Sequence, residues 1–327
     1  MLKFIGRRLL IYIPMLVLMS VVSYGIIEAP PGDYLTDYVA LMKARGEFDQ
    51  GEADRLQRRY GLGDPIYKRY WKWASGLVFW DLGDSLEFRR PVAELVNDRL
   101  AMTVVLGLFT ITFTWLMAIP IGVISAVKKY SFIDYFFTFL SYLGVGTPNF
   151  LIALILMWTA FAYFGISITG LYSDAYKDAP WTIGKVWDLL KHIWVPMVIL
   201  GTDGTARLTR ILRANLLDEL SKPYVEAARS KGISEFKLVL KYPTRIALNP
   251  FISTAGWNLA TLFGGDLIVG QVMSLPTVGP LLLTALQSQD MYMAGSIVLI
   301  LTALTLIGTL ISDIALAVTD PRIRIGA

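Results

Sequence analysis

Long, nearly uncharged apolar runs constrain the fold of this chain more than any other feature. A helix that crosses a bilayer needs about 20 consecutive, mostly apolar residues. Charged residues make up only 17% of the 327 residues, against roughly 25% in soluble domains. The sequence therefore predicts an all-α polytopic membrane protein with six transmembrane helices. The six runs cover residues 9–27, 102–127, 150–168, 193–216, 249–272 and 293–318.

The first apolar run also fits a secretory signal peptide, because Lys3, Arg7 and Arg8 precede it. However, the run is long for a signal peptide. The sequence Glu-Ala-Pro-Pro that follows it, at 28–31, also offers no small-x-small cleavage site. We therefore expect an uncleaved membrane helix.

A shorter apolar stretch, 133–145, lies just before the third predicted span. Gly144, Gly146, Thr147 and Pro148 interrupt it. We interpret the stretch as a helix along the inner membrane interface that leads into the third span. A single long, kinked span is the alternative.

Basic residues in the short loops set the orientation, because lysine and arginine are retained on the cytoplasmic side. With the N-terminus inside, the inner segments include the basic stretch 207–245 together with Arg322 and Arg324. The segment 29–99 also holds 11 basic residues, but its 12 acidic residues leave it nearly neutral. Segments longer than about 60 residues also translocate largely regardless of charge. The sequence thus predicts that both termini are cytoplasmic.

This topology divides the chain into three regions. Residues 1–28 form the N-terminal tail and first helix, 29–100 form a small extracytoplasmic domain, and 101–327 form a five-helix core. The extracytoplasmic domain is rich in tyrosine and tryptophan between residues 66 and 80. Such side chains fit an aromatic belt at the membrane surface, and equally a docking surface for an external partner. Both interpretations stay open.

The cytoplasmic loop between the fourth and fifth spans predicts two short helices joined at a glycine, within residues 221–247. Ser221 can cap the first helix and Ser234 the second. Glycine suits the left-handed residue that closes a helix, so the first helix should end near it. A solvated basic hairpin close to anionic lipid is the alternative. The residues that mark this elbow are Glu226, Ala227, Ala228 and Gly232.

Several kinds of chemistry are missing from the sequence. There is no cysteine, and His192 is the single histidine, which excludes thiolate and multi-histidine metal sites. The sequence contains no Gly-x4-Gly-Lys-Ser/Thr phosphate loop and no Gly-x-Ser-x-Gly elbow. We therefore predict a non-enzymatic chain without catalytic, cofactor-binding or metal-binding residues, and without a nucleic-acid partner.

Ionisable residues inside predicted spans are candidates for function. Asp203 and Arg207 are four residues apart on one helical face, and we interpret them as a structural ion pair. Gly264, Gly265 and Asp266 interrupt the fifth span. We favour a translocation pathway for these three residues, with close helix packing around the glycines as the alternative.

The chain resembles the permeases of ABC importers, of the type 1 oligopeptide/dipeptide (peptide/nickel) subfamily. The resemblance rests first on Glu226-Ala227-Ala228, Gly232 and the later Pro250, which are similar to the coupling motif of these permeases. Further motifs extend it over essentially the full chain. These are Tyr60 to Pro65, Asp81 to Ser85, Arg90 to Val92 and the closing segment Asp320 to Arg324.

The resemblance implies a type I importer permease that forms half of a translocation pathway for oligopeptides in a bacterial or archaeal cell membrane. It implies several partners: a second homologous permease, two ABC ATPase subunits or one heterodimer, an extracytoplasmic solute-binding protein and the lipid bilayer. ATP and Mg would bind the ATPase subunits, and the elbow at 221–247 would couple them to this chain.

Alternative functions stay open at this point. The sequence Gly270 to Met273 departs from the subfamily, where many peptide permeases carry a glutamate, so an oligosaccharide is the second candidate cargo. A membrane scaffold or receptor whose inner loop binds anionic lipid is an alternative of another class. A secondary transporter would require inverted repeats, and we find no convincing internal repeat.

Overall fold

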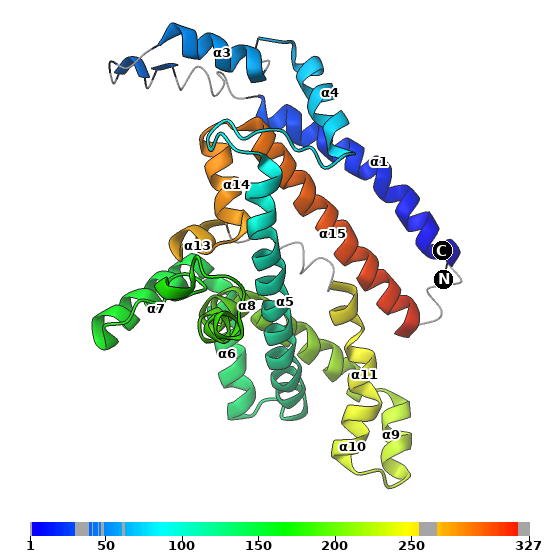
Figure 1. Ribbon diagram of the computed structural model, residues 1–327. Coiled ribbons are helices and arrows are strands. Elements are labelled where there is room, and N and C mark those ends of the chain that lie inside the picture. The colour runs from blue at the N-terminus through cyan, green and yellow to red at the C-terminus, as the bar shows by residue number, and fades with distance from the viewer. Residues whose placement is uncertain are drawn as a thin grey trace. The chain divides into compact units, whose positions relative to one another are not determined.

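The computed structural model describes residues 2–29, 39–40, 42–44, 46, 49–60, 63–254 and 267–319. These residues are mostly helical, and their one isolated β-bridge joins Asp84 and Pro91. The predicted all-α class is confirmed. The helices are α1 (Leu2–Ile27), α3 (Gln50–Tyr60), α4 (Ile66–Leu77), α5 (Val92–Val127), α6 (Phe132–Gly146), α7 (Asn149–Phe164), the 3-10 helix η1 (Asp174–Tyr176), α8 (Ile183–Leu220), α9 (Pro223–Ser230), α10 (Glu235–Lys241), α11 (Pro243–Ala247), α13 (Leu267–Val272), α14 (Val278–Gln287) and α15 (Met291–Thr319) (Figure 1).

Three of the described helices, α1, α5 and α15, are long and apolar enough to cross a membrane. They contain the first, second and sixth predicted spans. The fourth predicted span lies inside α8, which is longer but carries Asp203 and several arginines. Residues 255–266 of the fifth predicted span lie outside the described residues.

The third predicted span and the apolar stretch before it form two helices, α6 and α7, which are bent by 101° relative to each other. The break lies at Thr147 and Pro148, where Thr147 is extended. Proline disfavours a helical conformation in the residue before it, which explains why α6 stops there. By length and composition this pair is a broken span or a re-entrant loop.

The chain divides into two compact units, and α5 and α15 each contribute to both. The first unit comprises Val104–Pro276 and the chain from Thr305 onward. Within it α6, α7 and α11 pack on α8. Small residues permit close approach at these contacts. A Cβ atom on Gly144 of α6 would lie 3.1 Å from Ala206 Cβ of α8, and one on Gly201 would lie 2.7 Å from the ring of Phe113.

The second unit comprises Leu2–Thr103 and Thr277–Leu304. Here α4 packs on α1 through a cluster of aromatic rings, with the centroids of Tyr24 and Trp73 separated by 5.4 Å. The indole nitrogen of the buried Trp73 donates a hydrogen bond to Ser296 Oγ of α15 at 3.0 Å. An ion pair between Arg69 and Glu28, at 2.6 Å, fixes the start of α4 to the end of α1.

Candidate functional site

The predicted elbow is present as a compact helical hairpin that follows α8. Pro223 opens α9, where a missing N–H is harmless because the first-turn donors lack intrahelical partners anyway. After a short turn, α10 begins at Glu235 and α11 at Pro243. In Figure 1, α9 and α10 lie side by side at one end of the first unit, with α11 leading back from them.

Gly232 forms the turn of this hairpin. Its φ of +75° lies in the left-handed region, and an added Cβ would meet no atom within 4 Å. The constraint on this position is therefore the backbone conformation and not space. Arg229 and Glu235 close the turn with a bidentate pair, in which Arg229 Nη2 and Nε lie 2.6 and 3.1 Å from the carboxylate oxygens. The hydrogen bonds from Arg229 lower the pKa of Glu235.

One face of the hairpin is fixed to the helical bundle. Val225 of α9 and Leu238 of α10 are fully buried, and both belong to one core with Leu212 and Leu216 of α8. Ala126 of α5 completes the same core. Because each of these side chains is enclosed by the others, a force on α9 or α10 is transmitted to α5 and α8 through close packing.

The opposite face of the hairpin is open. Glu226 and Ala227 are exposed, whereas Ala228 is half-buried toward the core. Phe236 of α10 is 79% exposed. Beside it, α10 and the end of α5 enclose an apolar hollow of about 260 Å³. Exposed apolar surface rimmed by charge is typical of a protein interaction site.

The predicted capping role of Ser221 is wrong. Ser221 ends α8, where its hydroxyl donates to the carbonyl of Asp218, and Lys222 is the residue before α9. Serine is common just before a helix, so the sequence favoured Ser221 as the start of the next helix. It did not show that α8 continues to Leu220 and that Ser221 follows its end. Ser234 does precede α10, although without a hydrogen bond from its side chain.

Glu219 stabilises the junction between α8 and α9, a role that was not predicted from the sequence. Its side chain is 10% exposed, accepts a hydrogen bond from the Tyr224 hydroxyl at 2.7 Å and pairs with Lys222. Burial raises the pKa of Glu219, but hydrogen bonds from Lys222 and Tyr224 outweigh it, and the net shift is downward. Burial and the bond to Glu219 raise the pKa of Tyr224 to about 12. In the sequence, the spacing Glu-x-x-Lys-x-Tyr of Glu219, Lys222 and Tyr224 could have indicated this cluster.

Three arginines on α8 have distinct partners. Arg207 donates to Asp203 at 2.8 Å, and both side chains are partly exposed. Arg210 lies over the ring of Tyr142, 5.2 Å from its centroid. Arg213 pairs with Asp134 at the start of α6.

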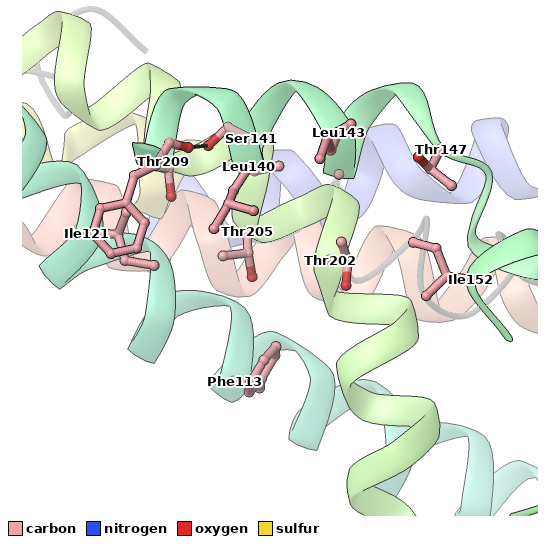
Figure 2. A pocket seen from close by; sticks show the side chains of 13 residues that line it. Phe113, Ile121, Leu140, Ser141, Leu143, Thr147, Ile152, Thr202, Thr205 and Thr209 are labelled. Carbon is pink, nitrogen blue, oxygen red and sulfur yellow. Dashed lines mark hydrogen bonds between the residues drawn. The ribbon is translucent and has the colours of Figure 1, made fainter. Parts of the chain in front are cut away.

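A cavity of about 370 Å³ lies between α5, α6, α7 and α8 in the first unit. Figure 2 shows its apolar lining together with a row of hydroxyl side chains, Thr202, Thr205 and Thr209, along α8. Ser141 and Thr202 donate to carbonyls of their own helices. The hydroxyl oxygen of Thr205 is buried and has no hydrogen-bond partner among the described residues.

The other predicted site residues are placed as follows. Gly264, Gly265 and Asp266 lie outside the described residues. His192 Nδ1 lies 2.7 Å from the Asp188 carbonyl one turn earlier in α8. Among the described ranges, no group of three or more His, Cys, Asp or Glu side chains could hold a metal ion.

An apolar helical bundle with several helices long enough to cross a membrane defines a polytopic membrane protein. Comparison with known proteins identifies the family. Residues 118–325 match the family described as binding-protein-dependent transport system inner membrane component. The chain belongs to this family.

Relatives of this family match over the whole chain. The oligopeptide transport system permease protein AppB of Bacillus subtilis is 34% identical over 99% of this chain and 100% of its own length. The dipeptide transport system permease protein DppB of Escherichia coli is 28% identical, over 99% of both chains. The glutathione transport system permease protein GsiC of Escherichia coli is also 28% identical over 99% of both.

Membership confirms the predicted class. The protein is a multi-pass inner-membrane component of a binding-protein-dependent ABC importer, a permease subunit and not itself an enzyme. Permeases of this family have no cofactor of their own. Binding-protein-dependent transport implies an ATPase and a solute-binding protein as partners.

Proposed function

We propose that this chain forms half of the pathway of an ATP-driven importer for oligopeptides. It pairs with a second, homologous permease, with two ATPase subunits or one ATPase heterodimer that bind ATP and Mg, and with an extracytoplasmic solute-binding protein. Both termini and the hairpin α9–α11 face the cytoplasm. The regions 1–28, 29–100 and 101–327 serve as first helix, external domain and transport core.

The hairpin is the observation that carries the coupling role. Its buried side joins the core of α5 and α8 through Val225 and Leu238, while Glu226, Ala227 and Phe236 remain exposed. A segment built this way can receive a push from a docked ATPase and transmit it to the bundle. Rocking of rigid helices around a central site would then alternate access to the two sides.

The coupling role is tested by a matched pair of glycine variants. Gly232→Val places a β-branched residue at φ +75°, and Gly165→Val does the same at φ +64° where α7 ends. Neither glycine has an atom within 4 Å of its Cβ position, so both variants impose backbone strain alone. We expect Gly232→Val to keep the complex assembled but to separate ATP hydrolysis from uptake, and Gly165→Val to keep them linked. Normal uptake by Gly232→Val in vesicles would refute the coupling role.

The cargo assignment is supported by the relatives, which are named for oligopeptide, dipeptide and glutathione transport. Binding of peptide and oligosaccharide panels to the partner solute-binding protein tests it directly, followed by uptake into vesicles that contain the complete importer. Peptide uptake is expected. Exclusive uptake of oligosaccharides would replace the cargo while leaving the coupling role intact.

The pathway assignment of Gly264, Gly265 and Asp266 rests on the sequence. A charge at the bilayer centre costs about 2.5–3.5 kcal/mol on insertion scales, so Asp266 should face water or a partner. The chain has no native cysteine, so Asp266→Cys provides a unique label. We expect it to react with a water-soluble thiol reagent at a rate that depends on nucleotide. Complete inertness with intact transport would place Asp266 in a helix contact instead.

A further inference from the structure

An apolar groove of about 570 Å³ lies in the second unit between α1, α4 and α15. This volume falls within the roughly 300–1,000 Å³ of small-molecule sites. Each long helix contributes side chains from one face. The groove is lined from α1 by Leu16, Val17 and Ser20, from α15 by Leu299, Ile300 and Ala303, and from α4 by residues that include Tyr70, Trp71 and Ala74.

The three hydroxyl side chains that line the groove, Ser20, Tyr70 and Ser75, are already hydrogen-bonded within the protein. Ser20 Oγ donates to the Val17 carbonyl at 2.7 Å and lies 2.9 Å from the Tyr70 hydroxyl. Ser75 Oγ donates to the carbonyl of Lys72. The groove therefore offers its occupant mainly carbon surface, which favours an apolar chain over a polar cargo.

The helices that form the groove indicate that lipid surrounds it. Two of its walls, α1 and α15, are long and apolar enough to cross a membrane. Helix α4 packs against the last turns of α1 and the first turns of α15, through Ser20, Glu28 and Ser296. Ala303 lies 12 residues after Met291, a rise of roughly 18 Å at 1.5 Å per residue. The groove thus extends from one membrane surface into the hydrocarbon region, which is about 30 Å thick.

The side of α4 next to the groove carries tryptophan and lysine side chains. Trp71 is 68% exposed and Trp80 is 49% exposed, as expected of amphipathic rings at a membrane interface. Lys68 and Lys72 do not line the groove, but both are exposed on α4, each three residues before a lining residue, Trp71 or Ser75. Their ammonium groups are complementary in charge to a phosphate, whereas Arg69 on the same helix is committed to Glu28.

We propose that this groove is a specific binding site for one membrane phospholipid. An acyl chain lies between α1 and α15 beneath α4, and the anionic headgroup lies at Lys68 and Lys72. The bound chain fills the space that α4 bridges and so holds the first and last spans together where the external domain begins.

The site is tested in the complete importer in nanodiscs. Phosphatidylglycerol or phosphatidylcholine with a diazirine on one acyl chain is photolysed, and mass spectrometry then maps the adducts. We expect adducts on Val17 and Ala303 to exceed those on Leu10, which is 70% exposed on α1 outside the groove. Equal labelling of Leu10 and the groove would mean ordinary surrounding lipid and would overturn the proposal.

Groove-filling and headgroup variants provide the second measurement. Ala303→Trp should lower groove adducts to the level of Leu10, while the control Leu10→Trp leaves them unchanged. If Ala303→Trp does not assemble, Ala74→Trp fills the groove from α4. Lys68→Gln and Lys72→Gln should each lower phosphatidylglycerol labelling about fivefold and spare phosphatidylcholine. Unchanged phosphatidylglycerol labelling when Lys68→Gln and Lys72→Gln are combined would refute the lipid site. Crosslinking of Ala303→Cys to a partner subunit by a thiol-attached photoreactive probe in native membranes would refute it as well.

Discussion

Arg213 of α8 donates two charge-assisted hydrogen bonds to the carboxylate of Asp134 at the start of α6, both 2.7 Å long. Asp134 is almost fully buried and also accepts the backbone N–H of Tyr130. The same carboxylate therefore completes the turn before α6 and fastens that turn to α8. Since α8 leads directly into the hairpin α9–α11, the pair ties α6 to the helix that would move with the hairpin in the proposed coupling mechanism.

Breaking this pair should destabilise the protein strongly. Arg213→Met leaves the Asp134 carboxylate without its cation, and the loss of one partner from a buried pair costs about 3–5 kcal/mol. Because Arg213 is 25% exposed, we expect a value near the lower end. The thermal midpoint of the purified complex measures the effect.

The same helix supplies the matched control. Arg207 pairs with Asp203 at 2.8 Å, but their side chains are 57% and 35% exposed. Less of this pair is buried by the protein than of the Asp134–Arg213 pair, so Arg207→Met should shift the midpoint less than Arg213→Met. Similar shifts for Arg207→Met and Arg213→Met would contradict the structural role of the Asp134–Arg213 pair.

Of these two ion pairs, only the one within a single helix could be predicted from the sequence. The Asp203–Arg207 contact follows from a spacing of four on one helix and was therefore predictable from the sequence. Asp134 and Arg213 belong to different helices, and only packing of α6 on α8 brings them together. Likewise, the glycine turn at Gly232 was predictable from local conformational preference. Its packing on α5 was not, because it depends on contacts between distant segments.

Ionised Glu219 should stabilise the folded protein, and this contribution to the free energy of unfolding should be lost at acid pH. Its pKa is lowered in the folded state, so its contribution is present above the unfolded pKa of about 4.3 and is lost as pH falls through the folded value. Compared with wild type, Glu219→Gln should lose less stability on acidification in this window. Thermal midpoints measured at several pH values for both proteins test this. Parallel curves would show that the carboxylate is not stabilised in the folded state.

The hydroxyl of Tyr224 should support the same junction. Tyr224→Phe removes the donor to Glu219, and a hydrogen bond to a charged group contributes about 1.5–3 kcal/mol. We expect a lower thermal midpoint and, in vesicles, fewer cargo molecules taken up per ATP. Tyr142→Phe is the control, because Tyr142 lies outside the hairpin and presents its ring face to Arg210. An effect of equal size in both variants would argue against a special role for the junction.

The contribution of Asp290 to the stability of the fold should change with pH in the opposite direction to that of Glu219. It precedes α15 and accepts hydrogen bonds from Ser85 Oγ at 2.5 Å and from the backbone N–H groups of Met293 and Glu87. Burial nevertheless raises its pKa. Between the unfolded value of about 3.9 and the raised folded value, the native state binds more protons than the unfolded state. Stability therefore falls as pH rises through this window.

Asp290→Asn should abolish this loss of stability with rising pH, because an amide does not ionise. Its comparison with Glu219→Gln is informative, since the two variants change the pH curve in opposite directions. Retention of the wild-type slope in Asp290→Asn would show that another group is responsible for it.

The cavity in the first unit allows a prediction from its hydroxyl groups. Thr205 Oγ is buried without a described partner, whereas Thr202 Oγ donates to the Val198 carbonyl at 2.7 Å. Both residues lie on α8, and valine has nearly the shape of threonine. An unsatisfied buried hydroxyl carries a desolvation penalty of about 1–3 kcal/mol. Thr205→Val should therefore leave the thermal midpoint unchanged or raise it, and Thr202→Val should lower it because a hydrogen bond is lost.

A lower midpoint for Thr205→Val would mean that its hydroxyl is paired in solution, with water or with another subunit. Cargo uptake by Thr205→Val gives separate information about transport. The cavity walls come from α5, α6, α7 and α8, and α5 and α8 contribute to the core to which the hairpin is fixed. If the midpoint of Thr205→Val is maintained while cargo uptake falls, the loss cannot come from unfolding. The hydroxyl would then act during the transport cycle, when movement of the hairpin changes the spacing between these helices.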